Sequence, residues 1–264
     1  MKKLIYPKIA VDVFWIQLFW ALGYLGVVFV IHIIKTVTSI INNDKVSHYF
    51  ANVHVTSNIF MLVIGIISTY GFLQYYVENG VTRKDYFKGA ALASIGLSVA
   101  ISVVTSLVSL LEISIFKMMN VNFLADKSMI GVEADDFGGP IKDIIGNAVI
   151  SVVLPPFVSL ADHWLLAVLV LALNLFCFYL IGWFISASIY RLGGVVGLVS
   201  IIISFVIVYL YDFLLRTVLN LPALAMFLDI QVPMVVAAIC IIIIIFIMLW
   251  MIKQLTKRAP INCR

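Results

Sequence analysis

The segment 78–89 reads Glu-Asn-Gly-Val-Thr-Arg-Lys-Asp-Tyr-Phe-Lys-Gly, and it is the most charged short segment between two long apolar runs. Thr82 and Asp85 stand three residues apart, the spacing at which a hydroxyl caps a helix start while an acid reaches back to the amide of the cap. This spacing predicts a short surface helix that begins near Arg83. The Asn-Gly pair at 79–80 is typical of the end of a preceding helix and of a sharp turn at a membrane surface.

The composition excludes a soluble globular domain. Of the 264 residues 64% are hydrophobic and 11% are charged, and the mean hydropathy is +1.16, whereas soluble domains are about 45–50% apolar. We therefore expect a polytopic membrane protein whose net charge of +4 marks topology rather than a nucleic-acid surface. Cys177, Cys240 and Cys263 lie in two apolar runs and the tail, so they predict neither a disulfide framework nor a metal-ligand cluster.

Six apolar runs are long enough to cross a hydrocarbon core of about 30 Å, which takes roughly 20 helical residues. They predict an all-α fold that forms one transmembrane domain over residues 1–264. An amphipathic pattern at 5–16 predicts an interfacial helix before the first span. The long loop 112–163 contains an apolar patch at 144–160, which is broken by two prolines and is expected to be interfacial or re-entrant on the outer face. The expected spans are about 15–34, 59–77, 90–111, 165–185, 195–215 and 235–252.

The basic residues predict that both termini are cytoplasmic. The segments 1–14, 78–88, 187–194 and 253–264 hold 11 of the 17 Lys and Arg residues, and cytoplasmic loops carry the excess of such residues. If the patch at 144–160 also crossed the membrane, the basic tail would lie outside. The count therefore favours six spans over seven.

Small residues recur along the third span. Ser94, Ser98, Ser102 and Ser106 are four residues apart on one helical face, and Gly96 and Ala100 are four apart on another. Small side chains let helix backbones approach closely, so a packing seam is the simpler interpretation. A polar track for a substrate is the alternative.

Ionisable side chains near the spans give few candidates for chemistry. Asp212 and Arg216 are four residues apart and are expected to pair near the outer end of the fifth span, either with a function or simply to satisfy each other. His32 has no Cys, Asp or Glu at ligand spacing, which predicts a tucked or surface histidine rather than a metal ligand. Glu112, Asp212 and Asp229 fall toward span ends, which argues against a gradient-driven carrier.

Motifs for catalysis are not found in the sequence. The glycines at 193, 194 and 197 do not form a phosphate loop, because no lysine follows them. The acidic cluster Glu133, Asp135 and Asp136 lacks the spacing of a calcium loop, which favours a solvated acidic loop. We expect no enzymatic activity, no cofactor and no metal, so that energy for active transport would come from an ion gradient or from another protein.

The pattern resembles the type-2 family of ATP-binding cassette permeases, the membrane subunits of exporters. The resemblance rests on the amphipathic entry at 5–16, six spans with both ends inside, the segment Asn79-Gly80-Val81-Thr82-Arg83-Lys84-Asp85-Tyr86-Phe87, and the turn Tyr190-Arg191-Leu192-Gly193-Gly194. One feature departs from the family pattern: the large outer loop lies between spans three and four rather than between five and six.

The resemblance implies a coupling helix that docks into a groove of a separate ATPase. The residues that it assigns to this helix are Thr82, Arg83, Lys84, Asp85, Tyr86 and Phe87, with the two aromatic residues as anchors. It also implies a cytoplasmic ATP-binding cassette subunit and a second permease, either a copy or a paralogue, as partners in the lipid of a bacterial plasma membrane.

Two other classes of function stay open. The first is a stand-alone secondary carrier or channel. The second is a membrane sensor or assembly factor without transport. In both of these cases the segment 78–89 is an ordinary basic anchoring loop that sets topology. A serine face and a hydrophobic outer loop suit lipids, peptides and drugs alike, so the sequence leaves the substrate open.

Overall fold

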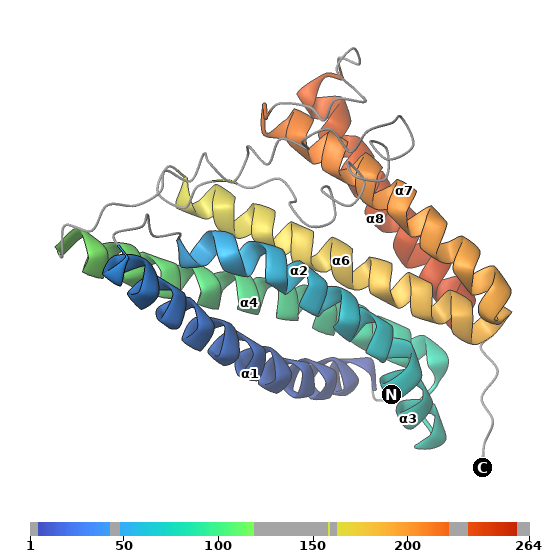
Figure 1. Cartoon of the computed structure of the whole chain (residues 1–264). Coiled ribbons are helices and arrows are strands. Elements are labelled where there is room, and N and C mark those ends of the chain that lie inside the picture. Colours follow the sequence, from blue (N-terminus) through green and yellow to red (C-terminus); the bar gives the residue numbers. More distant parts are fainter. Residues whose placement is uncertain (1–4, 43–47, 119–157, 159–162, 222–231, 258–264) are drawn as a thin grey trace. The chain divides into compact units, whose positions relative to one another are not determined.

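The computed structural model describes residues 5–42, 48–118, 158, 163–221 and 232–257. These residues form helices, with no strand among them, which confirms the all-α prediction. Six helical stretches are long and apolar enough to cross a membrane, so the chain is a multi-pass membrane protein. The elements are α1 (Tyr6–Ile41), α2 (Tyr49–Ile67), the π-helix η1 (Ser68–Leu73), α3 (Gln74–Glu78), α4 (Arg83–Met118), α6 (Trp164–Leu192), α7 (Gly194–Val218) and α8 (Met234–Lys257) (Figure 1).

The first helix corrects the prediction of a separate interfacial element. Helix α1 runs without a break for 36 residues, about 54 Å at 1.5 Å per residue, so residues 5–16 lead straight into the span. Pro7 lies in the first turn, where proline is tolerated, and no glycine or proline follows until Gly23. The buried face that starts at Ile9 and Val13 continues through Gln17 and Ala21, which keeps the helix in one piece.

The second span begins ten residues earlier than its apolar run. Helix α2 already begins at Tyr49, although residues 49–58 are too polar to be predicted as membrane-spanning. Several of their polar groups are paired inside the chain: the Asn58 side-chain amide donates to the His54 carbonyl at 2.9 Å, and His54 Nε2 lies 3.1 Å from the Asn174 amide nitrogen. Buried polar groups are tolerated when they are hydrogen-bonded.

The predicted short surface helix is instead the first turn of a long one. Helix α4 begins at Arg83 as expected, but it continues for 36 residues to Met118. No proline lies where the surface segment meets the apolar run. Gly89 lies there, in the second turn of α4, but the helix continues through it. Most of the predicted outer loop, including the patch 144–160 and the acidic cluster at 133–136, lies outside the described residues.

The chain divides into two compact units, which we describe separately. In the first unit, α1 runs beside α4 (Figure 1), and the contact is close at two glycines. A Cβ at Gly89 would lie 2.8 Å from the Ile9 side chain, and a Cβ at Gly96 would lie 3.3 Å from the Phe14 ring. Helix α1 also contacts α2, where the rings of Tyr24 and Phe60 stack with centroids 4.5 Å apart.

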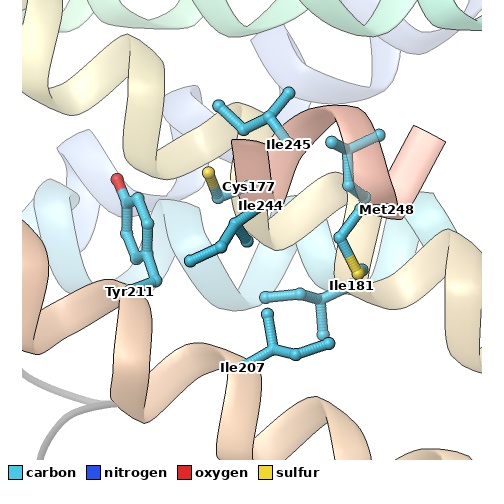
Figure 2. Close-up of a pocket in the computed structure, with 8 residues that line it drawn as sticks. Cys177, Ile181, Ile207, Tyr211, Ile244, Ile245 and Met248 are labelled. Atoms are coloured by element: carbon cyan, nitrogen blue, oxygen red, sulfur yellow. The ribbon is translucent and has the colours of Figure 1, made fainter. Parts of the chain in front are cut away.

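The second unit contains the end of α2 with η1 and α3, the start of α4, the second half of α6, and the helix pair α7 and α8 (Figure 1). Its core holds a small cavity of about 10 Å³, toward which Cys177, Tyr211 and Met248 point (Figure 2). This volume is at the lower limit for one water molecule, and half of the residues that line the cavity are isoleucines. The cavity is therefore a packing gap rather than a ligand site.

Candidate functional site: the turn at 79–88 and the cluster behind it

A left-handed glycine closes the first half of the turn. Helix α3 ends at Glu78, and Gly80 has a φ of 82°. The Val81 N–H donates to the Tyr76 carbonyl at 2.9 Å. The Gly80 N–H donates to the Val77 carbonyl at 3.0 Å, which completes a Schellman arrangement. The predicted helix end is thus confirmed, and glycine is the residue that adopts this conformation without strain.

A side-chain cap closes the second half. The Asp85 N–H donates to Thr82 Oγ1 at 3.1 Å, and the Thr82 hydroxyl donates to the Asp85 carboxylate at 2.7 Å. The sequence predicted that the acid would reach back to the amide of the cap. In the structure the Asp85 carboxylate accepts from the hydroxyl of the cap instead. Such a cap stabilises a helix start by about 1 kcal/mol, and the turn is consequently held at both ends.

Two arginines fasten turns of the second unit to the end of α8. Arg83 Nη1 donates to the Lys257 carbonyl at 3.2 Å, and Arg191 Nη1 donates to the Gln254 carbonyl at 3.0 Å. The last carbonyls of a helix have no partner within the helix and accept such donors readily. Three segments that were predicted to share one side of the membrane are therefore joined at one end of this unit.

Tyr86 is buried, which corrects its expected role as an anchor for a partner protein. Its side chain is 0% exposed. The Tyr86 hydroxyl donates to the Ser68 carbonyl and lies 2.9 Å from Ser68 Oγ, and the Tyr179 hydroxyl donates to that same Oγ at 3.2 Å. Tyr86 therefore links the start of α4 to η1 and α6.

The rest of this cluster is aromatic. The half-buried Phe87 ring packs against Trp183 with centroids 5.5 Å apart, and Trp183 itself is fully buried. One turn further along α6, Ser186 Oγ donates to Thr69 Oγ1 of η1 at 2.8 Å. A π-helical turn inside an α-helix is often found at functional sites. Here it is held by α4 and α6 directly behind the turn.

The exposed residues of the turn differ from the set that the sequence favoured. Among the predicted coupling residues, Thr82 and Lys84 are exposed, whereas Arg83, Asp85 and Phe87 are half-buried. An exposed aromatic side chain is supplied instead by Tyr75 of α3, at 60%. Sequence reasoning missed Tyr75 because it lies within an apolar run and carries no local signal.

The serine face of α4 is internal. Ser94, Ser98, Ser102 and Ser106 are all buried. Ser94 and Ser98 donate to carbonyls of their own helix at 2.9 and 2.8 Å, and Ser102 donates to the Val168 carbonyl of α6 at 2.6 Å. The Ser106 hydroxyl has no partner among the described residues. A hydroxyl that bonds the backbone of a neighbouring helix supports the packing interpretation.

A second buried constellation lies in the first unit and was missed from the sequence. His32 Nε2 lies 2.5 Å from Glu112 Oε1, and the other carboxylate oxygen accepts the Tyr49 N–H at 2.9 Å. The Asn52 amide nitrogen lies 3.3 Å from His32 Nδ1. Because an amide nitrogen only donates, Nδ1 accepts and Nε2 carries its proton toward Glu112. His32 is thus tucked in, as predicted, but with an acid as its partner.

The remaining candidates from the sequence are the ionisable residues of α7 and the possible metal ligands. Asp212 and Arg216 form the predicted pair, with Arg216 Nε 2.8 Å from Asp212 Oδ2. The described residues include no group of three or more His, Cys, Asp or Glu side chains that could hold a metal ion. Asp229 lies outside the described residues.

Comparison with protein-family models, with curated proteins and with solved structures gave no match.

Proposed function

We propose that the chain is the membrane-spanning permease subunit of an exporter that is driven by a separate ATP-binding cassette subunit. In this proposal the ATPase docks at the turn 79–88, a second permease completes the pathway, and the complex lies in a bacterial plasma membrane. This chain itself carries out no ATP hydrolysis.

The observation that carries the proposal is the construction of the turn. It is closed by Gly80 and capped by Thr82, and Lys84 is exposed on it. A docking element must be rigid to transmit force, and preorganisation also lowers the entropic cost of binding. Directly behind the turn, Tyr86 contacts η1, so a displacement of the turn would be transmitted to the core of this unit.

The turn is also connected to two further helices. Tyr179 of α6 joins the hydrogen bonds around Ser68, and Arg83 holds the end of α8. Movement of the turn would therefore be shared by η1, α4, α6 and α8. An ordinary anchoring loop requires basic residues but no such internal connections.

The test is a binding and turnover experiment with Tyr75→Ala. The tagged chain is purified from its native membranes, a co-purifying protein with a phosphate loop is identified, and the two are reconstituted. Loss of an interfacial aromatic anchor costs about 2 kcal/mol, roughly a 30-fold loss of affinity. Phe246→Ala is the matched control, because Phe246 is equally exposed, at 67%, but lies on α8 within the span.

Tyr86→Phe separates docking from transmission. This change removes a buried hydroxyl and leaves the exposed surface intact, so we expect unchanged ATPase binding with reduced coupling of ATP hydrolysis to transport. If no phosphate-loop protein co-purifies, or if Tyr75→Ala binds and turns over like the wild type, the docking role of this surface is wrong.

A stand-alone carrier is the second candidate, and the buried pair of His32 and Glu112 favours it. Ionisable residues inside a membrane often mark ion or proton pathways. Transport by the purified chain alone in vesicles, driven by a proton gradient and abolished by Glu112→Gln, would support the carrier over the permease subunit.

A further inference from the structure

The second unit has an apolar groove between α6, α7 and α8, at the end where α6 turns into α7. Its volume is about 280 Å³, which is far larger than the packing gap of Figure 2. Its walls combine aromatic, branched and small side chains of three helices, among them Phe184, Ser188, Val199, Ile203, Trp250 and Met251.

Positive charge gathers at one end of this groove. Gln254 lines the groove, and its carbonyl accepts a hydrogen bond from Arg191. Lys253 is the neighbour of Gln254 on α8, and Lys257 follows one turn later; both lysines are exposed. None of the described residues that line the groove is acidic. The lining of the groove itself therefore holds no carboxylate that would offset these cations.

The two features together describe a site for an amphiphile. An apolar groove open at a lipid-facing surface accepts a hydrocarbon chain, and basic residues at the level of the headgroups attract anionic lipids. The N-terminus of α7 lies at the same end and has no side-chain cap at Gly193, so its partial positive charge acts in the same direction.

We propose that this groove binds one acyl chain of an anionic membrane phospholipid, with the phosphate headgroup held near Arg191, Lys253 and Lys257. The ligand is a resident lipid of the surrounding leaflet. The site lies on α6, α7 and α8. It meets the turn at 79–88 only where Arg83 donates to the Lys257 carbonyl, and it does not depend on the proposed ATPase partner.

The headgroup is tested with charge variants of the full-length purified chain, without any partner protein. Native mass spectrometry compares the retention of phosphatidylglycerol and phosphatidylcholine with identical acyl chains. The wild type should retain phosphatidylglycerol more tightly. The double variant K253Q/K257Q should lose about 25-fold in phosphatidylglycerol affinity, about fivefold per charge, with little change for phosphatidylcholine. K8Q is the control, because it removes an exposed cation from α1.

The acyl chain is tested with a variant that fills the groove. Val199→Trp places a large side chain where Val199 lines the wall, and it should displace both lipids from the site. Leu198→Trp is the matched control, since Leu198 is 64% exposed on the same helix but is not part of the lining. Because both positions are exposed, folding is expected to survive either change.

Two outcomes would overturn the proposal. Equal retention of the two lipids by the wild type would mean general lipid solvation without a site. Unchanged phosphatidylglycerol binding by both K253Q/K257Q and Val199→Trp would show that the lipid is held elsewhere. Neither result bears on ATPase docking, because no ATPase is present in the measurement.

Discussion

Glu112 connects three helices through one carboxylate. One oxygen receives the His32 ring of α1, and the other receives the first N–H of α2 at Tyr49. The first N–H groups of a helix have no partner within it, and a negative charge there also interacts favourably with the helix dipole. A single side chain thereby fixes the start of α2 against α1 and α4.

We expect Glu112→Ala to be among the more destabilising substitutions in the chain. Removing the carboxylate leaves the His32 Nε2–H and the Tyr49 N–H without their acceptor, at about 1–3 kcal/mol each and together about 3 kcal/mol. At about 2–4 °C per kcal/mol, the apparent melting temperature of the detergent-solubilised protein should fall by roughly 6–12 °C.

A double-mutant cycle shows whether the loss belongs to the pair. His32→Ala combined with Glu112→Ala should cost less than the sum of the single changes, because the pair is already broken in each. Glu78→Ala is the control, since it removes an exposed carboxylate. Strict additivity of the two single changes would contradict the assigned contact.

Pairings of this kind lie beyond what the sequence predicts. His32 and Glu112 are 80 positions apart, and local spacing carries no information about contacts between distant helices. The same limit explains Tyr75 and Tyr86, which flank one turn. Which of the two faces inward depends on where Ser68 and Trp183 lie, whereas the i,i+4 pair of Asp212 and Arg216 was predictable because it is local.

At the scale of the helix, α2 and α6 approach closely at two glycines of the second unit. A Cβ at Gly65 would overlap the Tyr179 carbonyl oxygen and lie 2.9 Å from the Trp183 backbone nitrogen. A Cβ at Gly182 would overlap the Leu62 carbonyl oxygen. The glycines are therefore reciprocal, each making room for the backbone of the other helix, as small residues do in membrane helix pairs.

Gly65→Ala and Gly182→Ala should each push these helices apart. Overpacking costs about 1–3 kcal/mol, so the apparent melting temperature should drop by roughly 2–12 °C. Gly26→Ala is the matched control, because nothing lies within 4 Å of a Cβ at that position. It should be neutral or slightly stabilising, since alanine favours helix over glycine by about 1 kcal/mol. Equal effects at all three positions would contradict the close approach.

Element boundaries followed the sequence where turn chemistry is local. Gly80 and Thr82 predicted the end of α3 and the start of α4 because a positive φ and a capping hydroxyl act within a few residues. The continuity of the helices, in contrast, was not predicted from the sequence. Residues 5–16 differ from the following span in polarity, but polarity alone does not end a helix when no breaking residue intervenes, and the polar start of α2 is helical because its side chains find partners.

At the scale of the whole molecule, hydropathy alone predicted the six spans. Each predicted range lies inside an observed helix that is long and apolar enough to cross a membrane, because a run of about 20 apolar residues has few other stable structures in lipid. Sidedness comes from a different signal, the distribution of Lys and Arg. Within the second unit, the contacts of Arg83 and Arg191 with the end of α8 agree with that distribution.

The sidedness can be tested with single cysteines at two predicted cytoplasmic turns and at the far end of α4. In a background with all native cysteines replaced by alanine, we introduce single cysteines at Asn79 and Gly194, which were assigned to the cytoplasm, and at Met118, at the far end of α4. Met118 is 86% exposed, and a Cβ at Gly194 meets nothing within 4 Å. None of the three changes removes a basic residue, so the topology signal itself is preserved. A membrane-impermeant thiol reagent applied to intact cells should modify the cysteine at Met118 and leave those at Asn79 and Gly194 unmodified until the membrane is permeabilised.

The reverse pattern would place the turn 79–88 outside, where no cytoplasmic ATPase reaches it, and would end the proposed docking role. Modification at both Asn79 and Met118 from outside would mean that α4 does not cross the membrane.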